Sequence, residues 1–70
     1  MIMDSNWALI YTTGSPYKIE ILKGLLEENE IDSVIINKQD SSYHFGELEL
    51  YVKSVDVVKA KRIISAHEEF

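Results

Sequence analysis

Hydrophobic and polar residues alternate along the stretch Phe45–Lys53. Leu48, Leu50 and Val52 would point to one side, and the residues between them to the other. This is the period of a β-strand with one buried face, because successive side chains of a strand project to opposite sides of the sheet. The pattern is clearer here than anywhere else in the chain, so we take this stretch as the central strand of the fold.

Two further strands and two helices are predicted around this strand. The aromatic and β-branched stretch Trp7–Thr12 and the run Ser33–Asn37 have the composition of strands. Hydrophobic residues recur at helical spacing in two other segments, which predicts amphipathic helices over Pro16–Glu28 and Val55–His67. For the first strand the pattern leaves two choices of buried face, namely Trp7, Leu9 and Tyr11, or Ala8, Ile10 and Thr12.

Residue types near the helix ends support these bounds. Ser15 is a candidate N-cap, because its hydroxyl can accept a hydrogen bond from the first turn, and Pro16 suits the first helical position. Asn29 can adopt the left-handed conformation that ends a helix. Ser54 is the N-cap candidate for the second helix. Gly24 weakens the first helix, and we expect it to allow close approach of that helix to the sheet.

The predicted order of elements is β-α-β-β-α in a single α+β domain of residues 1–70, with loose ends at residues 1–6 and 68–70. The short connection between the second and third strands favours an antiparallel pair, and a β-α-β crossover is right-handed. If both helices cover one face, we expect the sheet order 1-3-2, with the third strand central. This is a ferredoxin-like fold whose last strand is missing, so the outer edge of the first strand would stay open.

The net charge of −5 argues against nucleic acid as a partner, because a phosphate backbone is bound by clustered Lys and Arg. The chain has no cysteine, which excludes disulfides and thiolate chemistry and fits the reducing cytoplasm. It shows neither a secretory signal nor an apolar run of the ~20 residues that a membrane span needs. We therefore expect a cytoplasmic protein that binds neither nucleic acid nor membranes.

No pattern in the chain predicts catalysis, a cofactor or a metal. The two histidines, His44 and His67, are far apart in the sequence, whereas a closed metal site needs several ligands in fixed geometry. Asp40, Ser41 and His44 include the residue types of a hydrolytic triad, but one short loop does not hold a base against a nucleophile. We therefore expect a protein that is not an enzyme.

Candidate partner-binding residues lie on the uncovered side of the predicted sheet and on the loop before its third strand. Tyr51 points away from the helices, and we expect Ile35 of the second strand to lie beside it. Such a group is either ordinary exposed surface or a patch that a partner covers. Specificity contacts on the loop would come from Lys38, Gln39, Tyr43 and His44.

Several segments together also carry a family resemblance. They are the Trp7 strand, the helix Ile19–Glu28, the Ile31 step into Val34–Asn37, the Gly46 turn, and Leu50–Val52 followed by Ala60 and Ile63. Through them, residues 7–64 resemble a family of small bacterial proteins described as putative prokaryotic signal-transducing proteins, related in fold to the PII (GlnB-like) regulators. The resemblance implies a ferredoxin-like, GlnB-like topology and a regulatory or binding role.

The chain departs from the PII regulators in its loops. Those proteins bind nucleotide with loops that this chain lacks, and they carry a long partner-binding loop where this chain has Lys38–His44. A glycine-rich phosphate cradle is also absent from the sequence, so nucleotide binding is not carried over.

The function expected from these observations is that of a non-enzymatic regulatory or protein-interaction module. It would bind a protein partner or a second copy of itself through the open sheet face, the edge of the first strand and the 38–44 loop. The alternative is a PII-like sensor that binds a small molecule, such as a nucleotide or another metabolite, between subunits.

Overall fold

The computed structural model describes residues 6–38 and 47–68, and its elements follow the predicted order. They are β1 (Trp7–Thr13), α1 (Pro16–Glu28), β2 (Ser33–Asn37), β3 (Leu48–Lys53), a 3-10 turn (Ser54–Asp56) and α2 (Val57–Glu68). The bounds of α1 and β2 are those predicted. α2 begins later than expected because the 3-10 turn precedes it.

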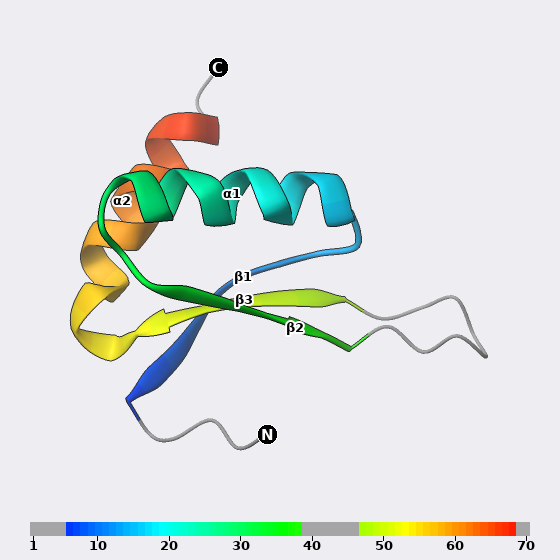
Figure 1. The fold of residues 1–70 in the computed structure, drawn as a ribbon, viewed down its shortest axis with the longest axis horizontal. Coiled ribbons are helices and arrows are strands. Elements are labelled where there is room, and N and C mark those ends of the chain that lie inside the picture. Colours follow the sequence, from blue (N-terminus) through cyan, green and yellow to red (C-terminus); the bar gives the residue numbers. More distant parts are fainter. Residues whose placement is uncertain (1–5, 39–46, 69–70) are drawn as a thin grey trace.

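β3 is the central strand of a three-stranded sheet with the order β1-β3-β2, and both neighbours run antiparallel to it. α1 and α2 lie together on one face of the sheet, and no described helix lies on the other face, which we call the open face (Figure 1). The predicted α+β fold and its strand order are thus confirmed. Among the described strands, β1 and β2 each have a single neighbour, so both are edge strands.

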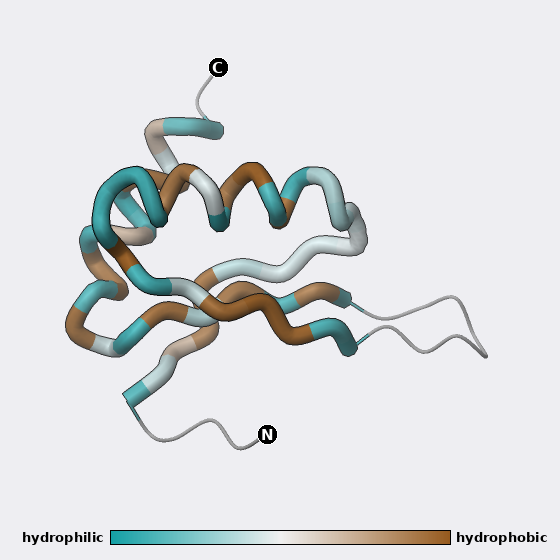
Figure 2. Tube along the Cα trace, viewed as in Figure 1, coloured by the Kyte–Doolittle hydropathy of each residue, from teal (hydrophilic) through white to brown (hydrophobic). Residues whose placement is uncertain are grey.

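The core lies between the helices and the sheet and consists of aliphatic side chains. Leu48, Leu50 and Val52 of β3 point into it, as their alternation predicts. They meet a stripe on α1 that the helical spacing also predicts. Figure 2 shows hydrophobic positions along β2 and β3 below α1. The other buried residues are Ile19, Leu22 and Leu26 of α1, Ile31 before β2, and Ala60 and Ile64 of α2.

A β-bulge in β1 decides which of its side chains reach the core. Leu9 pairs with Tyr51 whereas Tyr11 pairs with Leu50, so Ile10 is an extra residue in the ladder. As a result Ile10 and Tyr11 both pack against the core, although they are consecutive in the chain. Neither face considered for this strand is correct as a whole, because a strict period of two does not describe a bulged strand.

The register of β2 corrects one prediction. Ile35 lies opposite the buried Leu50 and packs against the core, so it faces the helices. Val34 lies opposite Tyr51 instead, and Ile36 follows it on the same face. The expectation that Ile35 accompanies Tyr51 on the open face was therefore wrong. The apolar run in the middle of β2 does not alternate, so the sequence pattern does not define its two faces.

Three local signals near the helices have different outcomes. Ser15 Oγ accepts a hydrogen bond from the backbone N–H of Lys18 at 3.2 Å and Pro16 follows as the first helical residue, so the predicted N-cap of α1 is confirmed. Ser54 is not an N-cap, because it is the first residue of the 3-10 turn, and no described side chain caps that turn. Gly24 does not allow close approach to the sheet: it is exposed, and a methyl group there would meet no described atom within 4 Å other than those of its chain neighbours and of its own helix backbone.

The end of α1 is closed by a Schellman motif at a residue that the sequence did not indicate. Asn29 keeps a φ of −100°, and the following Glu30 takes the left-handed conformation with a φ of 63°. The Glu30 N–H donates to the Glu27 carbonyl at 3.0 Å, and the Ile31 N–H donates to the Leu26 carbonyl at 3.0 Å. The motif directs Ile31 back into the core, where it is buried with Leu26.

Candidate interaction surface

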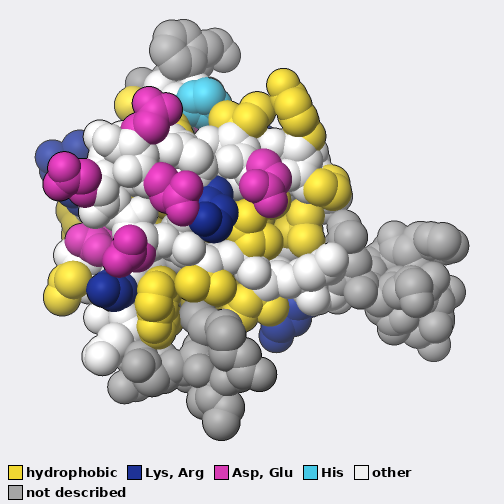
Figure 3. All heavy atoms as spheres, in the orientation of Figure 1, with side chains coloured by type: hydrophobic (Ala, Val, Ile, Leu, Met, Phe, Trp, Pro, Cys, Tyr) yellow, Lys and Arg dark blue, Asp and Glu magenta, His cyan; other side chains and the backbone are white. Residues whose placement is uncertain are grey.

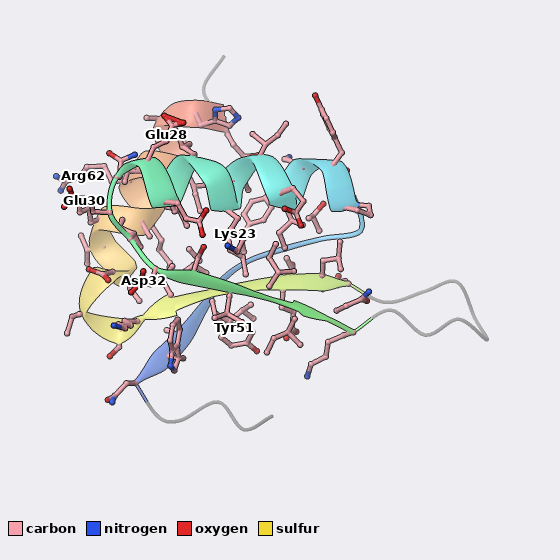
Figure 4. The ribbon with its side chains drawn as sticks, viewed as in Figure 1. Lys23, Glu28, Glu30, Asp32, Tyr51 and Arg62 are labelled. Carbon is pink, nitrogen blue, oxygen red and sulfur yellow. The ribbon has the colours of Figure 1, made fainter. Side chains whose placement is uncertain are left out.

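The open face of the sheet carries apolar side chains that no described helix covers. Tyr51 projects from the central strand on this face, away from α1 (Figure 4). Leu9 of β1 and Val34 of β2 lie directly opposite it on either side. Leu9 is 45% exposed, so part of this apolar surface is open to solvent. We call the group the open-face patch, and its residues are Trp7, Leu9, Val34, Ile36 and Tyr51.

A polar network holds the tyrosine of the open-face patch. The Tyr51 hydroxyl donates a hydrogen bond to Glu49 Oε1 at 2.8 Å, and Lys38 Nζ lies 3.8 Å from the same oxygen. The hydrogen bond to the carboxylate, helped by partial desolvation and by the negative charge, raises the pKa of the Tyr51 hydroxyl above its ordinary value of 10.0. The side chain of Glu49 is only 17% exposed. The Tyr51 ring therefore has its orientation fixed before a partner binds, which lowers the entropic cost of contact.

The structure brings two of the predicted contact residues together. Lys38 and Tyr51 meet through Glu49, a residue that the sequence pattern marked only as a solvent-facing charge. Ile35 lies on the helix side of the sheet and does not join them. The remaining candidates lie outside the described residues; they are Gln39, Tyr43 and His44.

Most of the open-face patch was not selected from the sequence. Val34 and Ile36 could have been found only through their pairing with β3, because directly opposed residues of neighbouring strands share a face. Trp7 and Leu9 belong to one of the two faces considered for the first strand, but the bulge separates them from Tyr11. Strand register, rather than composition, is thus the information that the sequence pattern lacked.

Charged side chains flank the open-face patch at both ends of β2. Asp32 precedes the strand, where its Oδ2 lies 3.6 Å from Lys53 Nζ, and Lys38 follows the strand (Figure 4 labels Asp32). The Asp32 side chain is 79% exposed and the Lys38 side chain 60%. An apolar centre with a charged, solvated rim is the usual anatomy of a protein–protein contact surface.

On the helix side, a cluster of three side chains joins β1 to both helices. Glu68 Oε2 accepts a hydrogen bond from the Tyr11 hydroxyl at 3.0 Å and lies 2.8 Å from Lys18 Nζ. Lys18 Nζ also lies 5.5 Å from the centroid of the Tyr11 ring, which is cation–π range. The hydrogen bond from Lys18, and to a smaller extent the one from Tyr11, lowers the pKa of Glu68 below 4.5. The same hydrogen bond to Glu68 raises the pKa of Lys18 above 10.5. Glu68, expected in a loose end, is thus part of α2 and tied to β1.

Replacing Glu68 by glutamine should lower the melting temperature by at most a few degrees at neutral pH, because exposed ion pairs contribute little. The folded-state pKa of Glu68 is depressed, so its contribution is present above pH 4.5 and is lost as the pH falls through the folded-state pKa. At the alkaline end, the ion pair stops stabilising the fold only above pH 10.5, because the pKa of Lys18 is raised. Thermal melts followed by circular dichroism at neutral pH and at about pH 2.5 test this prediction. A difference between the two proteins that persists undiminished in acid would contradict it.

The described residues give no sign of a metal site or a membrane span. His, Asp and Glu side chains in residues 6–38 and 47–68 form no group of three or more that could hold a metal ion. No helix in this part of the chain has both the length and the apolar character needed to cross a bilayer. Figure 3 shows acidic side chains spread over the helical layer on the face toward the viewer, in keeping with the net charge of −5.

Comparison with known proteins gives one match. The sequence profile of a family described as putative prokaryotic signal transducing protein matches residues 7–68, from the first residue of β1 to the last residue of α2. Searches among curated proteins and among solved structures found no significant match.

Proposed function

Because the chain belongs to the family of putative prokaryotic signal transducing proteins, we propose that it is a non-enzymatic regulatory module that binds a protein partner through the open-face patch. The observation that carries the proposal is the Tyr51 ring, which is held by Glu49 at the centre of an apolar group on the sheet face that no described helix covers.

The composition of the open-face patch supports binding to a protein. Tyrosine and tryptophan are enriched among the residues that dominate binding energy, because each offers a large apolar surface with a polar group attached. Trp7 and Tyr51 supply both types on one face of this sheet. Lys38 and Asp32 at the rim would contribute specificity rather than raw affinity. That the outer edge of β1 and the 38–44 loop also contact the partner remains a prediction.

Site-specific photo-cross-linking in the source cells tests the proposal. A photo-reactive amino acid at Leu9, within the open-face patch, should capture one discrete protein. Adding Ile36→Lys to the same chain should abolish this capture, because a charge would have to be buried in the contact. Val58, which is 72% exposed on α2, is the matched control for an exposed apolar position outside the patch.

The pattern of captured proteins separates the outcomes. Capture from Leu9 that is absent from Val58 and is lost with Ile36→Lys supports the proposal. Identical captured proteins from Leu9 and Val58, or capture that survives Ile36→Lys, would overturn it. Far-UV circular dichroism of the Ile36→Lys chain shows whether the fold is retained.

A small-molecule sensor is the second candidate, and one hollow favours it. This hollow has a volume of about 330 Å³, lies between β1 and α2, and is lined by Ile10, Lys61, Ile64, Ser65 and Glu68. Its lining combines two isoleucines with a cation, a hydroxyl group and a carboxylate, and polar groups of this kind can fix the orientation of a ligand. A thermal-shift panel with adenine nucleotides and common metabolites tests this candidate. The absence of a shift with every compound would count against it.

A further inference from the structure

We propose that two copies of this chain associate through the outer edge of β2, so that their sheets join into one continuous antiparallel sheet. The inference goes beyond the proposed function, because it concerns the backbone edge of β2 and a second copy of this chain, although the joined strands also bring Val34 and Ile36 of the open-face patch together. β2 is an edge strand among the described strands and lies in front of β3 in Figure 1. Unlike β1, it pairs with β3 without a register shift, so its edge is regular.

The backbone groups of β2 point alternately to its two sides. The Lys38 N–H donates to the Glu47 carbonyl at 2.9 Å, which directs it toward β3. The backbone N–H and C=O groups of successive residues in an antiparallel strand point to alternate sides. The backbone groups of Val34 and Ile36 therefore also point toward β3, whereas those of Ile35 point to the outer edge. Ile35 at the centre of the strand can therefore exchange a pair of hydrogen bonds with Ile35 of a second, antiparallel copy.

The sequence around Ile35 is complementary to itself in this arrangement. With Ile35 opposite Ile35 of the second copy, the opposed pairs are Val34 with Ile36, Ser33 with Asn37, and Asp32 with Lys38. Apolar residues thus meet apolar residues, polar residues meet polar residues, and the outermost pair has opposite charges. Cross-strand pairs of these kinds stabilise a sheet, and a two-fold axis forms each of the listed pairs twice.

Other registers lose this match. A slip by two residues would place Asp32 opposite Ile36 and Ile35 opposite Ser33, so that a charge would face an apolar side chain. A slip by one residue would bring side chains of the helix side and the open face opposite each other. The register centred on Ile35 is therefore the one that the strand specifies.

Asp32 and Lys38 are accessible for an ion pair with a second copy. Asp32 is 79% exposed and Lys38 is 60% exposed, and their partners within the chain lie at 3.6 Å and 3.8 Å, which is long for a charge-assisted hydrogen bond.

Charge reversal followed by sedimentation velocity over a range of protein concentrations tests the inference. The unmodified chain should form a reversible dimer. Asp32→Lys, or Lys38→Asp, places like charges opposite each other at both ends of the paired strands and should weaken the dimer roughly tenfold or more. The double variant restores opposite charges and should recover most of the lost affinity. Lys59→Asp on α2, which packs over β1, is the matched control and should leave the dimer unchanged.

Disulfide trapping checks the register independently, because the chain has no cysteine of its own. Val34 and Ile36 of opposite copies would form a non-hydrogen-bonded pair with Cα atoms about 4.5 Å apart, within disulfide range. A mixture of the Val34→Cys and Ile36→Cys chains should cross-link much faster than either chain alone. Equal rates in the mixture and in the separate chains would reject this register.

Two results would overturn the inference as a whole. One is an unmodified chain that stays monomeric at every concentration, and the other is a double variant that dimerises as weakly as the single variants. Neither result would affect photo-capture of a different protein from Leu9. Failure of the dimer and failure of the proposed function are therefore distinguishable.

Discussion

Replacement of Leu50 by alanine should lower the free energy of unfolding by about 2–5 kcal/mol. Leu50 is fully buried at 0% exposure in the central strand, and it lies between Tyr11 and Ile35 of the two edge strands. The loss has two parts, the lost burial of the aliphatic side chain and the cavity that its close-packed neighbours do not fill. A chain of this size has roughly 0.05–0.15 kcal/mol of stability per residue, so the substitution removes a large share of the total.

Urea unfolding followed by circular dichroism measures this effect. The midpoint should fall while the slope stays the same, because the surface exposed on unfolding hardly changes. Ile36→Ala is the matched control, since Ile36 is also an aliphatic strand residue but lies on the open face; it should cost less than about 1 kcal/mol. Ile35→Ala should cost more than Ile36→Ala because Ile35 packs against the core. The reverse order for these two isoleucines would show that the register of β2 is wrong.

Replacement of Glu30 by glycine should stabilise the protein by about 1 kcal/mol. Glu30 has a φ of 63°, a left-handed conformation in which the side chain of an L-residue crowds the backbone. Glycine adopts this conformation without that crowding, and it is the residue most often found at this position of a Schellman motif. The change also removes a negative charge beside the C-terminus of α1, where the helix dipole disfavours anions.

The contribution of the backbone can be separated from that of the charge. Glu30→Gln removes the charge but keeps the side chain, so it should recover only the smaller, electrostatic part of the gain. Thermal and urea unfolding of the two variants at neutral pH provide the comparison. If Glu30→Gly is no more stable than Glu30→Gln, the left-handed conformation is not the source of the cost.

Elements whose local signals agree with their tertiary surroundings could be predicted from the sequence. The alternation of β3 gives its buried face because one side of this strand meets the helices and the other does not. Ser15 and Pro16 mark the start of α1, since the capping hydroxyl and the missing N–H act within one turn. Sheet order followed from connection lengths and crossover rules, which leave few topologies open.

Features that depend on contacts between distant segments could not be predicted in the same way. The bulge at Ile10 exists only in the pairing of β1 with β3, and the central residues of β2 read equally well with either face buried. Asn29 has a higher intrinsic preference than Glu30 for the left-handed conformation, but burial of Ile31 against Leu26 places the turn one residue later. Within the candidate site, Tyr51 could be found from the sequence because it alternates with core residues. Val34 and Ile36 could be assigned to the open face only from the register of β2 against β3.

The irregular pairing of β1 has a consequence for how large an assembly this protein can form. A flat sheet with two receptive edges would add subunits at both ends and grow into a filament. The bulge twists the β1 edge and interrupts the regular spacing of its ladder, so an incoming strand finds a poor template there. Association through the opposite edge would therefore end with a closed pair rather than continue as linear polymerisation.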